Sequence, residues 1–506
     1  MLLLGIDIGT SSAKCVLVNE AGTVVARASG EYPLETPRPG WAEQDASLWV
    51  DAVFQAIRKL IAGTGVFPAE IGGISFSGQM HGLVALDGQG KVIRKPFLWC
   101  DQRTQAQCDR IENAAGGREA LLSMTNNVML TGYTGGKLLW LKEVEPENYR
   151  AMTVFLCPKD YVRYRMTGQA MMDVSDASGT GFFDTKNRVW CRELIYRAGL
   201  SPDVFPAVAE STVPAGQLTQ EAALATGLLA GTPCFAGGGD AVVQSFASGL
   251  LKEGTLGTVI GTAGNVSMGS MRYMENPGGQ LQMFCGVTPG SYMSFGSTQT
   301  AGGALRWFRD ELGQDIVLRA RKEGRSAYAL LDELALQSPP GANGIVFAPY
   351  LSGERCPYPD ANARGVLYGL SLNTRQSDIV RAVMEGIVFS LGQIVDIYRS
   401  FVKIDSVIAS GGGAASDVFL QMQADIFELP VHTVSAAEDG GAYGAALIAG
   451  LGLGLYKSPE DALKSLKQEK ECLPVASHLP GCRASFRLYR ELYPSLRHVY
   501  RMGADA

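Results

Sequence analysis

The chain begins with three short apolar runs that are separated by tight turns. Residues 2–8 read LLLGIDI, and the runs KCVLVN (14–19) and TVVARA (23–28) follow them. Apolar runs of this length between turn residues are typical of β-strands, so we predict a meander of three strands. A helix is predicted over residues 45–62, where apolar side chains recur at helical spacing behind Asp45, a candidate N-cap.

The second half of the chain repeats this pattern. GTAGNVSM (261–268) aligns with GTSSAKCV (9–16), and each segment follows an apolar strand. We interpret the two copies as a duplicated unit of strand, Gly-Thr turn and strand. The alignment places Val259 where the first copy has Asp7, so only the N-terminal copy carries a carboxylate at this position.

Strands and helices alternate through the rest of the chain, which indicates an α/β fold class with layered domains. We predict strands over 71–78, 404–410 and 429–434, helices over 417–427, 438–452 and 483–500, and a strand directly after Gly239. A single core stops growing near roughly 250–300 residues. The 506 residues therefore predict two domains, 1–248 and 249–506, with a cleft between them.

Composition and charge narrow the class of partner. Glycine is in excess, at 61 of 506 residues, so many backbone positions need a positive φ or a close ligand approach. The net charge of −6 argues against nucleic acid or an anionic membrane as the main partner and favours a small molecule. The longest apolar stretch, 443–456, is short for a membrane span. Ten scattered cysteines without C-x-x-C, and only four histidines, favour a reducing cytoplasm over a zinc or disulfide framework.

Four glycine turns at strand ends are candidates for phosphate binding. They are residues 9–12, 237–239, 261–264 and 411–413. Backbone N–H groups that converge in such turns bind anionic oxygens, although a simple hairpin glycine explains any single turn. Neither a G-x-G-x-x-G sequence nor a P-loop is present, which disfavours an NAD-dependent dehydrogenase.

Two carboxylates lie in or beside these turns. Asp7 stands in an apolar strand, where an ionised carboxylate is costly unless a cation such as Mg²⁺ or hydrogen bonds compensate it. Asp240 follows three glycines, so its side chain projects from a turn whose backbone lets a substrate approach. The structural alternatives are a buried hydrogen bond for Asp7 and an Asx-turn for Asp240.

Two further segments offer candidate substrate contacts. GQMHG places Met80 and His81 at a strand end between glycines that open the backbone. LWCDQR offers Trp99, whose ring would stack on a sugar face, and Asp101, whose carboxylate would accept hydroxyl hydrogen bonds. The structural alternatives are a histidine that only supports the fold, a tryptophan in the core and an Asp–Arg pair on the surface.

Together these motifs resemble the FGGY family of carbohydrate kinases. The resemblance rests on GIDIGTSSAK (5–14), GWAEQD (40–45), GQMHG (78–82), LWCDQR (98–103), GGGD (237–240), GTAG (261–264), YLSGER (350–355) and ASGGGA (409–414). Residues 365–387 resemble the family's C-terminal signature; Thr134, Lys137 and Trp140 match the N-terminal one, which departs at Val144. GQMHG and LWCDQR look most like the branch that phosphorylates D-xylulose.

The resemblance implies two actin-like, ribonuclease-H-like domains, each a mixed β-sheet with flanking helices, and phosphoryl transfer from Mg-ATP to an open-chain sugar. By motif position it implies Asp240 as the general base, Asp7 as the residue near Mg²⁺ and the phosphates, and Met80 with His81 as sugar contacts. The nucleotide contacts that it implies are Gly9, Thr10, Ser11, Gly261, Thr262, Gly411, Gly412, Gly413 and Ser416. A homodimer is common in the family and is expected here.

One departure from the family's pattern leaves open which sugar accepts the phosphoryl group. Ala241 stands where the D-xylulose branch usually has Asn, and losing that amide removes a hydrogen-bonding partner for a sugar hydroxyl. A family kinase for ribulose, gluconate or glycerol is therefore an alternative. An actin-like ATP-driven switch is disfavoured, because a switch needs no polyol pocket, and a catalytically inactive sugar sensor is disfavoured because both aspartates are present. Glu354 and Arg355 would either touch ligand or brace the fold.

Overall fold

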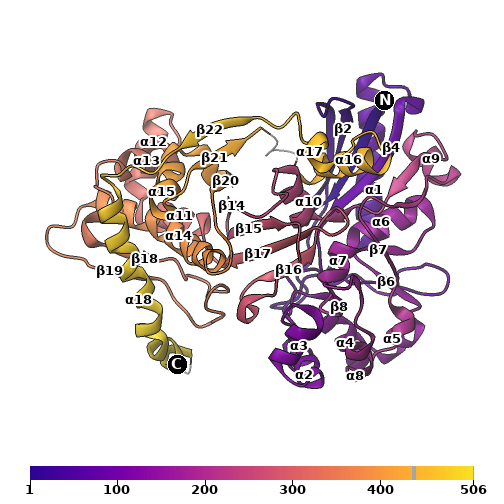
Figure 1. Ribbon diagram of the computed structural model, residues 1–506, viewed down its shortest axis with the longest axis horizontal. Helices are drawn as coiled ribbons and strands as arrows, with labels where there is room; N and C mark the ends of the chain where they lie inside the picture. The colour runs from indigo at the N-terminus through magenta and orange to yellow at the C-terminus, as the bar shows by residue number, and fades with distance from the viewer. Residues whose placement is uncertain (436–439, 505–506) are drawn as a thin grey trace. The chain divides into compact units, whose positions relative to one another are not determined.

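The computed structural model describes residues 1–435 and 440–504, which fall into two compact units. The first unit comprises Met1–Leu251, Gly269–Ser294 and Glu438–Leu466, and the second comprises Lys252–Met268, Phe295–Ala437 and Lys467–Ala506. The first unit thus contains two segments from the second half of the chain. Each unit is built on a β-sheet with flanking helices (Figure 1), which confirms the predicted α/β class.

The sheet of the first unit grows from the predicted N-terminal meander. Its hydrogen-bonded order is β11-β12-β4-β1-β2-β3, and β13 pairs with the end of β4. The strands are β1 (Leu2–Ile8), β2 (Ser12–Asn19), β3 (Val24–Glu31), β4 (Ile71–Gly78), β11 (Pro214–Gln217), β12 (Pro233–Phe235) and β13 (Gly238–Gly239). Because β1 pairs antiparallel with β2 and parallel with β4, it lies in the middle of the sheet.

Helices cover this sheet, and one of them comes from late in the chain. α1 (Ala46–Thr64) packs on β2 and β3, and the Asp45 carboxylate caps it by accepting from the Ser47 N–H, as predicted. α16 (Gly440–Gly452) packs on β1 and β4 and is the yellow helix beside these strands in Figure 1. It was predicted over 438–452, of which 438–439 lie outside the described residues.

Close packing of α16 on β1 explains a glycine in the middle of that strand. A Cβ on Gly5 would overlap the carbonyl of Ala442 in α16. Glycine therefore lets the helix backbone approach the strand backbone directly. This approach brings the first turn of α16 to the end of β1, where Asp7 lies.

The strand predicted after Gly239 is wrong, because residues Asp240–Ala247 form helix α10. Val242, Val243 and Phe246 are buried, and Phe246 follows the two valines by four and three positions, which suits one face of a helix. A run this short is too brief for its periodicity to separate a strand from a helix. As a result Asp240 begins a helix instead of extending a strand.

Smaller elements complete the first unit. Its other helices are α2 (Gln105–Ala115), α3 (Arg118–Thr125), α4 (Thr134–Val144), α5 (Pro146–Ala151), α6 (Pro158–Thr167), α7 (Val174–Ser178), α8 (Arg192–Arg197), α9 (Gln220–Thr226) and α17 (Pro459–Ala462). Its other strands are β5 (Val84–Leu86), β6 (Val154–Leu156), β7 (Met171–Asp173), β8 (Phe183–Asp184), β9 (Val189–Trp190), β10 (Ala207–Ala209) and β16 (Gln282–Cys285).

The second unit has a sheet in the order β17-β15-β14-β20-β21-β22. These strands are β14 (Thr255–Ile260), β15 (Gly264–Ser270), β17 (Tyr292–Thr298), β20 (Ser406–Ser410), β21 (Val431–Val434) and β22 (Gln468–Cys472), and a separate pair is β18 (Val346–Ala348) and β19 (Val366–Tyr368). The helices are α11 (Gly302–Trp307), α12 (Gln314–Glu323), α13 (Ala327–Ala335), α14 (Gln376–Arg399), α15 (Asp417–Phe427) and α18 (Leu479–Ala504). The helices predicted over 417–427 and 483–500 are confirmed by α15 and α18.

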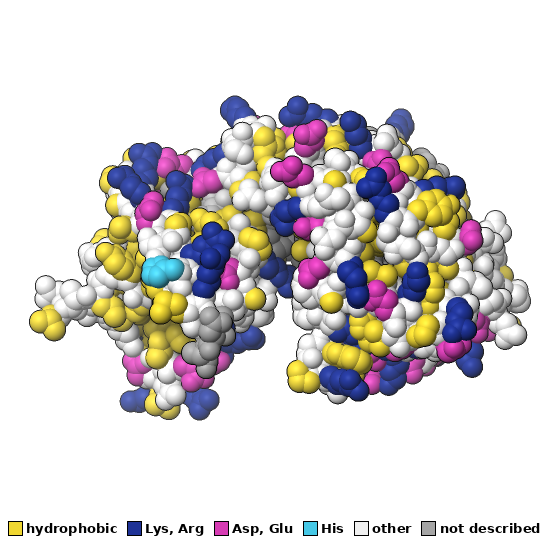
Figure 2. Space-filling view, turned by 90° about the horizontal axis from the view of Figure 1, so that it is seen from below, with side chains coloured by type: hydrophobic (Ala, Val, Ile, Leu, Met, Phe, Trp, Pro, Cys, Tyr) yellow, Lys and Arg dark blue, Asp and Glu magenta, His cyan; other side chains and the backbone are white. Residues whose placement is uncertain are grey.

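The surface agrees with the modest net charge. On the face drawn in Figure 2, basic and acidic side chains are interspersed with uncharged ones. Among residues 1–435 and 440–504, every helix is either too short or too polar to cross a lipid bilayer.

Candidate functional site

The first Gly-Thr hairpin joins β1 to β2 and is held by side chains from other elements. The Gly9 N–H donates to the Ser12 carbonyl across the turn at 3.0 Å. The Tyr32 hydroxyl donates to the Gly9 carbonyl at 2.7 Å, and Gln44 Nε2 donates to the Thr10 carbonyl at 2.7 Å. Ser11 and Tyr32 also line an open pocket of about 580 Å³. Sequence reasoning missed the two bracing residues, although Gln44 belongs to the GWAEQD motif.

Asp7 lies one residue before the end of β1 and is half-buried. Parallel pairing with β4 places Ser77 beside it, and the Ser77 hydroxyl donates to Asp7 Oδ1 at 2.7 Å. Burial raises the pKa of Asp7, while the Ser77 hydrogen bond and the charge of Lys14 act in the opposite direction. Gly441 of α16 lies against the carboxylate, since a Cβ there would stand 2.7 Å from Asp7 Cγ.

Asp240 begins α10 directly after β13, whose two residues pair with the end of β4. The side chain is half-buried and accepts the N–H of Ala241 at 2.7 Å. Burial raises the pKa of Asp240 to about 7, with a further contribution from the negative charge of Asp7. The structure therefore brings the two predicted aspartates together, because Asp7 pairs with Ser77 and Gly239, the residue before Asp240, pairs with Gly78 at the same end of β4. A carboxyl group with this pKa suits proton transfer near neutral pH.

Met80 and His81 follow β4 and come back toward Gly239. A Cβ on Gly239 would overlap the Met80 side chain, so Met80 packs directly on Gly239, the residue before Asp240. His81 has φ +67°, a left-handed conformation that is uncommon for a residue with a side chain. Its Nδ1 lies 2.8 Å from the Gly179 carbonyl, and its ring stacks on Tyr133 with centroids 4.7 Å apart. Strained conformations of this kind cluster at functional sites.

Lys137 fixes the turn that carries Met80 and His81 through two hydrogen bonds. Its fully buried Nζ donates to the His81 carbonyl at 2.7 Å and to the Gly132 carbonyl at 2.5 Å. Burial lowers the pKa of Lys137 to about 7, partly offset by the negative charge of Asp101. The lysine of the family-like N-terminal signature therefore anchors the backbone that carries His81.

Trp99 and Asp101 have different surroundings. Trp99 is 39% exposed, and its Nε1 donates to Thr10 Oγ1 at 2.9 Å. Asp101 is fully buried, and its carboxylate accepts the Ala42 N–H at 2.8 Å and the Arg103 Nε at 2.9 and 3.0 Å. The contacts of Asp101 favour the alternative of an Asp–Arg pair, but the expected surface location is wrong, because both side chains are buried. The contacts of Trp99 place its ring at the first hairpin.

In the second unit the Gly261-Thr262 hairpin is held by backbone groups. The Gly261 N–H donates to the Ala263 carbonyl across the turn at 3.0 Å, and the Thr262 side chain is exposed. The N–H of Ala301 donates to the Thr262 carbonyl at 2.9 Å, and that of Gly302 donates to the Gly261 carbonyl at 2.8 Å. The start of α11 therefore fixes this turn.

The Gly411–Gly413 turn lies beside the second hairpin. A Cβ on Gly413 would stand 2.6 Å from the Cβ of Ile260, the last residue of β14, and Gly411 has φ +76°. The structure thus brings together two of the turns predicted to bind nucleotide. Ser416 serves as the N-cap of α15, because its hydroxyl accepts the Phe419 N–H at 3.1 Å.

Glu354 of the YLSGER motif acts as a brace in the second unit. Its buried carboxylate accepts the Thr298 hydroxyl at 2.6 Å, the Gln299 N–H at 2.8 Å and the Arg355 N–H at 2.7 Å. Burial raises the pKa of Glu354 to about 7. These contacts fix the corner that leads from β17 into residues 301–303, so Glu354 supports the second hairpin indirectly.

Comparison with models of known protein families matches both halves of the chain to one family. The model of the FGGY family of carbohydrate kinases, N-terminal domain, matches residues 2–247, and the model of the C-terminal domain of the same family matches residues 258–453.

Individual relatives match over nearly the whole chain. A xylulose kinase from Bacillus subtilis (strain 168) is 37% identical over 493 residues, which cover 97% of this chain and 96% of the relative. A gluconokinase from the same organism is 30% identical over 505 residues, with 99% and 96% covered. The crystal structure of ligand-bound xylulose kinase from Lactobacillus acidophilus matches with a TM-score of 0.92 and 26% identity, and 99% of each chain is covered. This match confirms the predicted actin-like fold of the two domains.

Proposed function

Because the chain belongs to the FGGY family of carbohydrate kinases, we propose that it transfers the γ-phosphoryl group of ATP to O5 of D-xylulose, giving D-xylulose 5-phosphate and ADP. The relative from Bacillus subtilis is a xylulose kinase, which supports this acceptor. The observation that carries the proposal is Asp240, a half-buried carboxyl group with a pKa of about 7 next to Asp7 and Met80.

Asp240 acts as the general base. It accepts the proton of the attacking hydroxyl as the oxygen bonds to phosphorus and the bond to the ADP oxygen breaks. Phosphoryl transfer depends on positioning and charge neutralisation more than on covalent chemistry, so one correctly placed base is sufficient. The proximity of Asp7 strengthens this base, because a neighbouring negative charge raises the proton affinity of Asp240.

The residues at the end of β1 fit a divalent cation. Asp7 is half-buried, and its Oδ1 accepts a hydrogen bond from the Ser77 hydroxyl, so the carboxylate offers hard oxygen ligands of the kind Mg²⁺ prefers. Mg²⁺ bound with ATP neutralises charge on the phosphates. In this proposal Asp7 would hold the cation, Ser77 orients the carboxylate, and the N–H groups of Thr10 and Ser11 bind phosphate oxygens.

His81 and Met80 position the sugar. The Gly179 carbonyl only accepts, so the hydrogen bond to it requires that His81 Nδ1 carry a proton. In the neutral ring Nε2 is then an acceptor for a sugar hydroxyl. Lys137 and the Tyr133 stack fix the ring in this orientation, and Met80 supplies an apolar contact beside Asp240.

The nucleotide is assigned to the second unit. The exposed Gly261–Ala263 hairpin offers backbone N–H groups to phosphate oxygens, and the Gly411–Gly413 turn beside it accommodates the nucleoside. Glycine at these positions leaves room for close approach of a ligand to the backbone.

Gluconate is the second candidate acceptor. The match to a gluconokinase at 30% identity over 99% of the chain supports it, and Ala241 lacks the amide that the D-xylulose branch usually carries. A coupled ADP-release assay on the purified protein, with D-xylulose, ribulose, gluconate and glycerol at equal concentrations, separates these acceptors. We expect the largest kcat/KM with D-xylulose. A larger value with gluconate would replace the proposed acceptor.

A further inference from the structure

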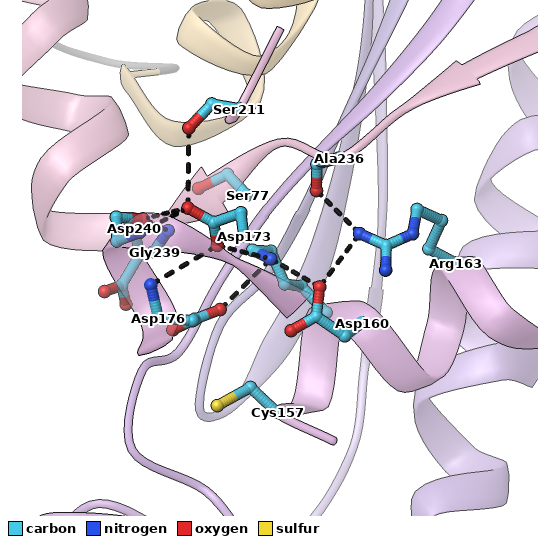
Figure 3. A network of polar contacts seen from close by, with 12 residues as sticks. Ser77, Cys157, Asp160, Arg163, Asp173, Asp176, Ser211, Ala236, Gly239 and Asp240 are labelled. Carbon is cyan, nitrogen blue, oxygen red and sulfur yellow. Dashed lines mark hydrogen bonds and ion pairs between the residues drawn. The ribbon is translucent and has the colours of Figure 1, made fainter. Parts of the chain in front are cut away.

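A cluster of buried charges lies next to the residues that lead into Asp240 (Figure 3). The cluster consists of Lys159, Asp160 and Arg163 on α6 and of Asp173 and Asp176 around α7, all with 0% exposure. Lys159 Nζ lies 2.6 Å from an Asp160 oxygen, 2.9 Å from Asp173 and 3.1 Å from Asp176. Burying charges is expensive unless each is paired, so such a cluster calls for a function.

The cluster is not a cation site. Cys157, Asp160 and Asp176 offer ligand atoms within 4.8 Å of one another. However, the Lys159 ammonium already contacts both carboxylates, and Arg163 Nη1 donates to Asp160 at 2.9 Å. Burial raises the pKa of Asp176 well above its usual range. Lys159 and Arg163 thus already compensate most of the negative charge of the three carboxylates without a metal.

One chain of hydrogen bonds leaves the cluster toward Asp240. Ser175 Oγ donates its hydrogen to Asp173 Oδ2 at 2.5 Å, and the Ser175 N–H donates to the same oxygen at 2.7 Å. Because its single hydrogen is used in this way, Ser175 Oγ presents a lone pair, which accepts the Gly239 N–H at 2.9 Å. Gly239 immediately precedes Asp240, and Figure 3 shows both beside Asp173.

We propose that Ser175 is a positioning residue for the general base, and that the buried cluster fixes Asp240 through the Gly239 amide. This inference rests on the proposed function, in which Asp240 is the base. β13 has only two residues, and its last residue, Gly239, anchors the start of α10 through the hydrogen bond of its amide to Ser175. The cluster also reaches the sugar-binding turn, because a Cβ on Gly78 would stand 2.9 Å from Lys159 Cβ.

The chain offers a matched control for this serine. Ser178 lies on the same short helix, is 1% exposed, donates to the Val174 carbonyl at 2.7 Å and accepts the Cys285 N–H at 3.1 Å. Each serine-to-alanine change therefore leaves one buried N–H without its acceptor, and both variants should lose similar thermal stability. Only Ser175→Ala frees the amide next to Asp240.

The test compares Ser175→Ala with Ser178→Ala in the full-length protein. We expect Ser175→Ala to lower kcat about 10- to 100-fold, because a displacement of a reacting group by about 1 Å can slow the reaction by up to about 100-fold. The KM for ATP should stay within about twofold of the wild-type value. The acid limb of its kcat profile should move to lower pH, since a looser Asp240 is better solvated. Ser178→Ala should keep the wild-type kcat within about twofold. If Ser175→Ala does not fold, Ser175→Cys, which keeps a weak acceptor, should give an intermediate loss.

Hydrogen exchange tests the positioning without relying on activity. Amide exchange in a peptide that covers residues 238–241 should be faster in Ser175→Ala than in wild type and unchanged in Ser178→Ala. Equal exchange and equal kcat in the two variants would overturn the inference. If the wild type phosphorylates none of the sugars offered, the proposed function fails, and the exchange comparison still decides whether Ser175 fixes this segment.

Discussion

The two Gly-Thr hairpins have the same framework but differ in one side chain. β1 pairs antiparallel with β2 and parallel with β4, and β14 pairs in the same way with β15 and β20. In the parallel ladders Asp7 stands opposite Ser77, and Val259 stands opposite Ser410. The repeat predicted from two short segments is therefore a repeat of pairing and register, in which one copy has a carboxylate and the other a methyl-bearing side chain.

The correspondence extends across both sheets. The order β3-β2-β1-β4-β12-β11 in the first unit matches β17-β15-β14-β20-β21-β22 in the second. In each, the fourth and fifth strands pair in parallel and the sixth pairs antiparallel with the fifth. The framework was thus kept while the chemistry at the hairpins diverged.

The hairpins also differ in what holds them. Side chains of Tyr32 and Gln44 bind the carbonyls of the first hairpin, whereas backbone N–H groups of Ala301 and Gly302 bind those of the second. Side-chain bracing tolerates variation in the backbone nearby, while backbone bracing requires glycine where the two segments touch. The two hairpins therefore share a strand framework and are fixed by different kinds of group.

Replacing Asp7 with Val makes the first hairpin like the second and should have the largest effect. Asp7→Val should lower kcat by at least about 100-fold, because it removes preorganised charge at the phosphates. The unfolding temperature should equal or exceed that of wild type, since burial disfavours the ionised carboxylate. Assays of ADP release and thermal unfolding check both. The reciprocal Val259→Asp should restore nothing, and a double variant with wild-type turnover would contradict the asymmetry.

The pH dependence of turnover tests the raised pKa of Asp240, to which burial and the nearby charge of Asp7 contribute. Because the pKa of Asp240 is raised to about 7, the base loses its ionised form as pH falls through that value. We expect kcat to be constant above about pH 8 and to fall about tenfold per pH unit below about 6. A profile of kcat under saturating substrates measures this. A profile that stays flat down to pH 5 would mean that Asp240 does not titrate in this range.

Gly302→Ala should affect only the second hairpin. The added Cβ would lie 2.6 Å from the Gly261 carbonyl oxygen and would displace it. Overpacking of about 1–3 kcal/mol against the turn should raise the KM for ATP about tenfold and leave the KM for the sugar unchanged. Gly63→Ala, at a position with nothing within 4 Å of the new Cβ, is the matched control and should change neither. A rise in the sugar KM alone would reverse our assignment of the two hairpins.

Gln44→Ala should have the smallest effect on activity and a clear effect on stability. It removes the donor to the Thr10 carbonyl and the acceptor of Trp49 Nε1, so the free energy of unfolding should fall by about 1–3 kcal/mol. We expect only a several-fold loss of kcat. Gln105→Ala, whose amide bonds to Asp109 on the surface of α2, is the control. Denaturant titration compares the two variants, and equal stability would show that Gln44 does not brace the hairpin.

Much of the framework was predictable because its signals are local. The strands 2–8 and 71–78 and the helix 417–427 were predicted with both ends, since the apolar pattern of each lies within the segment and turn or capping residues border it. The Asp7–Val259 asymmetry needed only an alignment of two short segments. The helix after Gly239 was mispredicted because its apolar run is short.

The support of the site was not predictable in the same way. Lys137 reaches the carbonyl of His81 and Ser175 reaches the amide of Gly239, and each pair is more than 50 residues apart in sequence. Such contacts depend on tertiary packing, which leaves no periodic signal in the chain. The Asp101–Arg103 pair shows the opposite case, a motif residue whose partner lies two positions away.

The most direct test of the account is the turnover of Asp240→Asn with D-xylulose and ATP. The substitution keeps the shape of the side chain and removes its ability to accept the hydroxyl proton. We predict a loss of about 10²- to 10⁴-fold in kcat, with ADP binding and the unfolding temperature close to those of wild type. A folded variant that keeps more than about a tenth of wild-type kcat would contradict the assignment of Asp240 as the base.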